Sequence, residues 1–310
     1  MTETKATTDR EAFRHETVML NETLECLAPC AGRTYADATV GGGGHSAGIL
    51  ERSAPDGRLI GVDRDEAALS AARERLAPWG ERVTLVHGPF AELRSILAGV
   101  GVPRVAGLVA DLGVSSPQLD RPERGFSFRA DGPLDMRMDR SGDVPTALEL
   151  IESLGERELA DVIYELGEER RSRPIARAIK RALERNELRT TEDLRRAVIR
   201  VTGPKRGRVD PATKTFQALR IAVNDELGQL DALLSALPDV LEDDAVAVVI
   251  SFHSLEDRRV KRFFKAEPTL APLTKKPLVA DAAELEANPR ARSAKLRAAR
   301  RVPRDAEVRA

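Results

Sequence analysis

A glycine-rich turn between two apolar segments constrains the fold of this chain more than any other feature. Residues 37–46 have the sequence DATVGGGGHS, and the later segment 59–63, LIGVD, ends in an acid. Glycines let a backbone approach a ligand closely, a helix that begins near His45 offers free N–H groups, and Asp63 is placed to hold a ribose. The turn indicates a nucleoside-cofactor site. A glycine-rich surface loop is the alternative, which the apolar segments on both sides disfavour.

The spacing of the glycines separates two classes of nucleoside cofactor. A nicotinamide fingerprint, G-x-G-x-x-G counted from Gly41, needs a third glycine where this chain has Ser46. Asp37 instead precedes Gly41 by four residues, a pattern similar to the first motif of S-adenosylmethionine-dependent methyltransferases, with Thr39 at its first glycine position. A carboxylate at Asp37 could accept a hydrogen bond from the methionine ammonium. We therefore expect S-adenosylmethionine as the cofactor.

Apolar segments alternate with helical patterns along the first 111 residues. We expect strands at 33–38, 58–63, 83–88 and 106–111, separated by helices at 46–52, 66–77 and 90–98. This βαβα order predicts an α/β fold with a doubly wound, mostly parallel sheet. Helical periodicity then takes over until the apolar strand 245–252 resumes the sheet. An all-helical unit is therefore inserted at the sheet edge where ligands bind.

The predicted organisation has three parts. Residues 1–132 and 236–310 form the two portions of the cofactor-binding domain, and residues 133–235 form the inserted helical domain for substrate recognition. Within the insert we expect helices at 147–154, 156–166, 172–185, 190–201 and 212–234. Thr146, Ser172 and Thr191 are the predicted N-caps.

The charge is distributed unevenly although the net charge is only −1. Residues 165–208 contain fourteen Lys or Arg against seven Asp or Glu, with a cluster at Lys205, Arg206 and Arg208, and the segment 288–301 is also basic. Basic patches near a cofactor site favour a polyanionic substrate such as RNA. Solvated helix faces are the alternative for any single arginine. Because Tyr164 is the only aromatic residue in the inserted helices before Phe216, phosphate contacts should outweigh base stacking there.

The sequence contains neither a predicted membrane-spanning segment nor a predicted metal site. The longest apolar run, 245–252, is too short to span a bilayer, and the polar start lacks the pattern of a signal peptide. We expect a cytoplasmic protein without membrane contact. Cys26 and Cys30 are the only cysteines and are interpreted as packing residues, so no metal is expected.

The segment after the fourth predicted strand, 109–120, should lie where a reacting atom meets the cofactor. Its Ser116-Pro117-Gln118 is half of the motif that amino-methyltransferases carry at this place. Acceptors that hold the two N–H bonds of an exocyclic amine can direct its lone pair toward a methyl donor. Asp111, Ser116 and Pro117 are the catalytic candidates on this basis, and a helix cap or turn acid is the alternative for Asp111.

Nine ordered blocks between about residues 13 and 302 resemble one family, that of ribosomal RNA small subunit methyltransferase H. They lie at 15–20, 37–46, 110–118, 125–128, 134–138, 211–220, 223–227, 250–257 and 288–297. The resemblance implies a Rossmann-like class I methyltransferase fold and methylation of N4 of a cytosine in the decoding region of 16S ribosomal RNA. The implied partner is 16S ribosomal RNA or the small ribosomal subunit, and a monomer and a homodimer both remain open.

The resemblance also implies a set of cofactor contacts. These are Gly43, Gly44 and His45 beside the amino-acid part, Asp63 on the ribose, Phe90 against the adenine, and Asp111 and Gln118 at the methyl end. The chain departs from the family pattern at Asp210 and Lys214, changes that could alter the packing of the insert or an RNA contact.

Two other functions and the role of one histidine remain open. An NAD-dependent oxidoreductase shares the sheet and the ribose acid but is disfavoured by Ser46. A ribosome-assembly factor with an inactive cofactor pocket is disfavoured by the intact Asp63, Asp111 and glycine turn. His253, at the end of the fifth predicted strand, is either a functional group or a histidine hydrogen-bonded to a neighbour.

Overall fold

The computed structural model describes residues 17–204 and 209–303. Its centre is a seven-stranded sheet with the order β3-β2-β1-β4-β5-β7-β6. Strands β1 to β5 are parallel, and β7 is antiparallel to both of its neighbours. This arrangement confirms the predicted mostly parallel sheet. The strand bounds are β1 Thr34–Asp37, β2 Arg58–Asp63, β3 Val83–His87, β4 Val105–Asp111, β5 Leu241–Ser251, β6 Leu270–Pro272 and β7 Lys295–Arg301.

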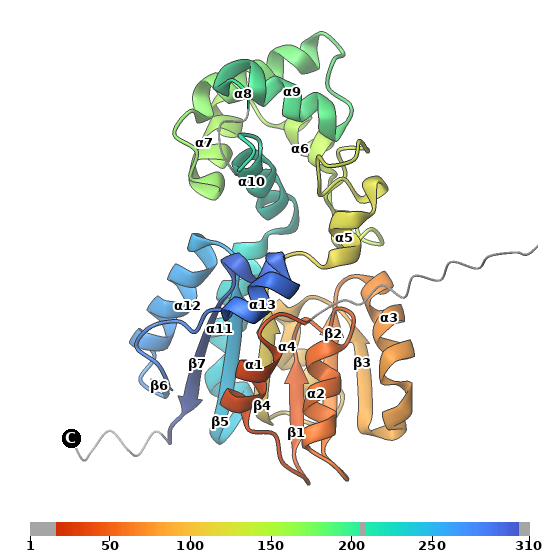
Figure 1. Ribbon diagram of the computed structural model, residues 1–310, viewed down its shortest axis with the longest axis vertical. Coiled ribbons are helices and arrows are strands. Elements are labelled where there is room, and N and C mark those ends of the chain that lie inside the picture. Colours follow the sequence, from red (N-terminus) through yellow and green to blue (C-terminus); the bar gives the residue numbers. More distant parts are fainter. Residues whose placement is uncertain (1–16, 205–208, 304–310) are drawn as a thin grey trace, which may run out of the picture.

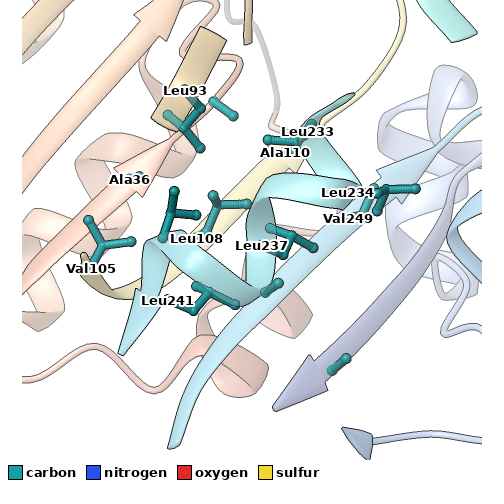
Figure 2. Close-up of a cluster of buried hydrophobic side chains, with 14 of the residues drawn as sticks. Ala36, Leu93, Val105, Leu108, Ala110, Leu233, Leu234, Leu237, Leu241 and Val249 are labelled. Carbon is teal, nitrogen blue, oxygen red and sulfur yellow. The ribbon is translucent and has the colours of Figure 1, made fainter. Parts of the chain in front are cut away.

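Helices cover both faces of the sheet, which makes it doubly wound (Figure 1). Alternation along β4 sends Leu108 and Ala110 to one face and Val109 to the other. The first face packs against α4 (Leu93–Gly99), α11 (Glu226–Val240) and α12 (Ser254–Ala266). Figure 2 shows Leu237 of α11 beside Leu108 and Leu233 beside Ala110. The second face packs against α1 (Leu20–Leu27), α2 (Gly44–Arg52) and α3 (Glu66–Leu76).

Five further helices form a separate group beyond the carboxyl ends of the parallel strands (Figure 1). They have their own apolar cluster, which extends from Phe126 to Val223. Asp210 and Lys214 both bond within this group, to Arg195 and to the carbonyl oxygen of Glu168. The bounds are α6 Ala147–Ser153, α7 Glu156–Gly167, α8 Ser172–Glu184, α9 Thr191–Thr202 and α10 Thr213–Asn224.

The predicted helix 212–234 is wrong as a single element. It is divided into α10 and α11 at Asp225, which takes the left-handed conformation with φ 46°. Four leucines of α11 pack on the sheet, namely Leu230, Leu233, Leu234 and Leu237. The apolar residues Phe216, Leu219 and Val223 of α10 pack within the helical group instead. A uniform helical period cannot reveal this change of partner.

Two of the three predicted N-caps in the insert are also wrong. Thr146 caps α6 as expected, through a capping box with Glu149. Ser172 is instead the first residue of α8, and the cap of α9 is Thr190 rather than Thr191. Thr190 and Asp193 form the capping box there, so the predicted N-cap lies one residue after the observed one.

The basic C-terminal segment is partly structural. Its second half is strand β7, in which Arg297 and Arg301 are buried. Arg297 Nε donates to Asp257 Oδ1 at 2.7 Å, so its charge is balanced inside the fold. The short helix α13 (Ala282–Ala287) precedes this segment. None of the helices in the described part of the chain combines the length and apolar character needed to cross a membrane.

Candidate active site

A pocket opens at the carboxyl ends of β1, β2 and β4, beneath the inserted helices. One side is formed by the glycine turn and the ends of the first strands. The opposite side is formed by the start of α11, the end of β5 and the segment after α13. The residues that line the pocket are Thr17, Val18, Ala38, Thr39, Val40, Gly41, Gly42, Gly44, His45, Asp63, Arg64, Ala68, Phe90, Asp111, Leu112, Gly113, Val114, Ser115, Gln118, Met138, Glu226, Phe252, Glu256, Asn288 and Arg290.

The glycine turn shapes the first side of the pocket through its backbone. Gly43 is the N-cap of α2 in the left-handed conformation, with φ 77°, which an L side chain rarely adopts. A Cβ atom at Gly44 would lie 1.8 Å from Oγ1 of Thr17, so a side chain there would displace Thr17. Gly44 and His45 line the pocket, whereas Gly43 contributes the bend that brings them to it.

Asp37 has a different place from the expected one. Its side chain is buried and accepts hydrogen bonds from Oγ of Ser46, at 2.6 Å, and from the backbone N–H of Thr39, at 3.2 Å. Asp37 does not line the pocket, so the expectation that it faces the methionine ammonium is not supported. Burial raises the pKa of this carboxyl to about 6. The same Ser46 that breaks the nicotinamide fingerprint thus anchors the carboxylate under the turn.

Asp63 links the second strand to the glycine turn. Its Oδ2 accepts from the backbone N–H of Gly41 at 2.8 Å, and its Oδ1 accepts from that of Asp65 at 2.9 Å. Burial raises its pKa to about 6. Because a carboxylate offers about four lone-pair sites, these two bonds leave acceptors free for the hydroxyls of a ribose. Phe90, half-buried after β3, lines the same side of the pocket.

Asp111 carries the least satisfied polar group of the pocket. Its backbone N–H donates to Oγ1 of Thr39 at 2.7 Å, which fixes the end of β4 against the turn. Its Oδ1 is buried and has no hydrogen-bond partner in the described structure. Burial and the nearby carboxylates of Asp37 and Glu256 raise the pKa of Asp111 well above its ordinary value. An unpaired buried oxygen beside other acids favours a cationic or hydrogen-bond-donating ligand.

Gln118 connects the loop after β4 to the cofactor side. Its Nε2 donates to Oδ2 of Asp65 at 2.8 Å, and its Oε1 accepts from the backbone N–H of Ser115 at 2.9 Å. Both ends of the amide are therefore used to hold the loop in place. Ser116 and Pro117 begin the helix α5 (Ser116–Asp120) directly after Ser115, and their side chains lie outside the described part of the structure.

The far side of the pocket contains residues that the sequence analysis did not select. Glu226, Phe252, Glu256 and Arg290 come from parts of the chain that are distant from the glycine turn. Their local sequences signal helix starts and a strand end, so only the tertiary fold brings them to the pocket. His253 is the N-cap of α12 and forms a capping box with Glu256, in agreement with its interpretation as a histidine bonded to a neighbour.

Comparisons with known proteins cover nearly the whole chain. The model of the MraW methylase family matches residues 12–302. Ribosomal RNA small subunit methyltransferase H of Sorangium cellulosum is 61% identical over 290 residues, which are 93% of this chain and 91% of that protein. The proteins of the same name from Synechococcus sp. (strain CC9605) and Anaeromyxobacter sp. (strain Fw109-5) are 54% and 47% identical, over 94% of this chain and 98% of each relative.

Proposed function

Since the chain belongs to the MraW methylase family, we propose that it methylates N4 of a cytosine in the decoding region of 16S ribosomal RNA. The family makes it an S-adenosylmethionine-dependent methyltransferase. The observation that carries the finer proposal is the carboxyl of Asp111, which lines the pocket and has one oxygen without a hydrogen-bond partner in the described structure. An exocyclic amine can donate hydrogen bonds to such a carboxyl. The relatives named for the small ribosomal subunit support the choice of RNA.

The residues that line the pocket supply the groups that S-adenosylmethionine needs, namely two carboxyls, an aromatic ring and the glycine turn. We assign the ribose to Asp63, the adenine to Phe90 and the amino-acid part to the turn at Gly43, Gly44 and His45. When bound, the cofactor supplies a methyl group on a positively charged sulfur. The carboxylates of Asp63 and Asp111 favour that charge, and both lie on the side of the pocket that the glycine turn forms.

Asp111 has two tasks in the proposed reaction. By accepting a hydrogen bond from the amine, it directs the nitrogen lone pair toward the methyl group. The cofactor would supply the methyl group, and the amine nitrogen that accepts it would become positively charged and would then have to release a proton to the Asp111 carboxyl. A carboxyl with a raised pKa holds such a proton more readily than an ordinary one. Gln118 keeps the Ser115 loop, with Ser116 and Pro117 behind it, next to the reacting nitrogen.

The inserted helices are the proposed RNA-recognition unit, within the segment 133–235. On α8 the exposed Arg173, Arg177 and Arg181 follow one another at intervals of four residues and so share one face. This face can follow a phosphate backbone. The cluster Lys205, Arg206 and Arg208 was also predicted to bind RNA, and it lies outside the described residues. We propose free 16S ribosomal RNA or the small subunit, in the cytoplasm, as the substrate.

Mass spectrometry of 16S ribosomal RNA tests this function directly. RNA from cells that lack the protein should lack one N4-methyl group on a cytosine, and purified protein with S-adenosylmethionine should restore it. The matched control is protein with Asp111→Asn, which should restore little. A missing methyl on a ribose or on another base would refute the proposed target. No missing methyl at all would favour an assembly factor.

A further inference from the structure

The start of α11, the end of β5 and the start of α12 contribute a part of the pocket lining, here called the compartment, that combines one aromatic ring with two buried acids. Phe252, Glu226 and Glu256 form this lining. We propose that this compartment receives the target base and selects for an exocyclic amine, because its carboxylates reject a carbonyl oxygen at the same position. The inference rests on the proposed function and adds to it the residues that tell cytosine from uracil.

Phe252 supplies the flat wall. It is half-buried, follows β5 directly and lines the pocket. Gly113, in the loop after β4, has φ 101°, and a Cβ atom there would lie 3.3 Å from Cδ2 of Phe252. The ring therefore lies against the loop that begins at Asp111. A base stacked on Phe252 would have its edge near the Asp111 carboxyl.

Glu256 supplies a carboxylate that remains charged. It is 3% exposed, and its Oε2 accepts from the backbone N–H groups of Phe252, at 2.9 Å, and of His253, at 3.3 Å. Burial acts to raise the pKa of Glu256, but His253 and the Arg220 guanidinium hold it below its ordinary value. A buried anion accepts hydrogen bonds and cannot donate them.

Glu226 supplies the second carboxylate. Its two oxygens accept from Nε and Nη2 of Arg220, each at 2.7 Å. These bonds occupy about half of the lone-pair sites of the group and leave the rest for a ligand. Arg220 is thus a positioning residue that holds Glu226 at the pocket wall.

His253 lies beside the two acids of the compartment but does not line the pocket itself. Its side chain is only 9% exposed, and its Nε2 lies 3.2 Å from Oε1 of Glu256 but makes no hydrogen bond within the described structure. Ligand atoms of His253, Glu226 and Glu256 lie within 4.8 Å of one another, a spacing that a metal ion could also use. The positive charge of the Arg220 guanidinium beside Glu226 disfavours binding of a metal cation at this place. It does not repel an exocyclic amine, which is neutral.

The donor and acceptor pattern of the two bases explains the selection. Cytosine carries an amine where uracil carries a carbonyl oxygen. In a buried site, the amine of cytosine donates a hydrogen bond to a carboxylate. The carbonyl oxygen of uracil is an acceptor like the carboxylate, so no hydrogen bond forms between them. One hydrogen bond to a charged group corresponds to a preference of about ten- to hundredfold.

Binding of single nucleotides tests the selection apart from catalysis. The full-length protein, saturated with S-adenosylhomocysteine, is titrated with cytidine 5′-monophosphate and with uridine 5′-monophosphate by calorimetry or ligand-observed NMR. We expect the cytidine nucleotide to bind at least about tenfold more tightly. Glu256→Gln should reduce this ratio to near one, since an amide can donate to a carbonyl oxygen. Glutamine also serves at this capping-box position, so the start of α12 is retained.

Two variants separate selection from general damage. Phe252→Leu should weaken both nucleotides and leave their ratio unchanged, because stacking does not depend on the amine. Glu242→Gln, at an exposed site near the start of β5, should change neither affinity. A parental ratio in Glu256→Gln, no binding of either nucleotide, or binding that a chelator abolishes would each overturn the inference. If mass spectrometry still locates the methyl on a cytosine, the proposed function survives any of these results.

Discussion

Nδ1 of His45 lies 3.9 Å from Oδ2 of Asp111. One residue belongs to the first turn of α2 and the other ends β4, so the two motifs meet at the same wall of the pocket. Oδ1 of Asp111 is left without a partner within the described structure, while Oδ2 faces the imidazole. The acid is therefore oriented by the cofactor turn, and its side chain is 23% exposed where it lines the pocket.

Asp111→Asn should slow methyl transfer much more than it weakens RNA binding. The asparagine keeps the size of the side chain but cannot take up the proton, and a group at the reacting centre acts mainly in the transition state. Single-turnover methyl transfer at saturating S-adenosylmethionine and RNA measures the step directly. A rate equal to that of the parent protein would leave Asp111 with a structural or cofactor-binding role only.

Asp63→Ala should weaken S-adenosylmethionine binding about tenfold or more. Each lost charge-assisted hydrogen bond to the ribose corresponds to about 1.5–3 kcal/mol. Calorimetry with S-adenosylmethionine measures the dissociation constant. Asp56→Ala is the matched control, since Asp56 likewise accepts from a glycine N–H, that of Gly32, but at an exposed site outside the pocket. Equal affinities in the two variants would exclude the ribose role.

The contributions of Asp37 and Asp63 to the free energy of unfolding should fall as the pH rises from about 4 to about 6. Asp37 and Asp63 both have pKa values of about 6 in the folded protein, against an ordinary value of 3.8, so the folded chain binds more protons than the unfolded chain in this window. Asp37→Asn should remove on the order of 2–3 kcal/mol of this decrease. Urea unfolding at several pH values checks it. The exposed Asp56→Asn should keep the parental slope.

The double variant Arg173→Ala/Arg181→Ala should weaken RNA binding and flatten its salt dependence. Both side chains are exposed and have no acidic partner in the described structure, and each lost phosphate contact lowers the slope by about 0.7–0.9. Arg196→Ala/Arg200→Ala removes the same charge from exposed sites on α9 that are paired with Asp193 and Glu187. This control should have the smaller effect. Equal slopes in both double variants would assign the α8 arginines to a solvated face.

Local patterns predicted the elements of this fold more successfully than the contacts between them. The alternation of strands and helices up to Asp111 follows from apolar periodicity, and the parallel sheet follows from that order. The role of Asp37 was not predictable, because its partner Ser46 was interpreted only as a missing glycine. Glu226 and Glu256 were missed because their sequence signals describe helix starts, and their pocket role depends on packing between distant segments.

The backbone N–H of Met138 donates to Oδ1 of Asn224 at 2.8 Å, across 86 residues of sequence. This bond joins the places where the chain enters and leaves the inserted helices, while β4 and β5 are neighbours in the sheet on either side of the insert. For a folding chain, the entropic free-energy cost of closing a loop rises with the length of the loop. Helices that form first and bring their ends together shorten the loop between β4 and β5 about threefold, which lowers the closure cost by about 1 kcal/mol. We therefore expect the helical insert to fold early and to accelerate the pairing of the strands that flank it.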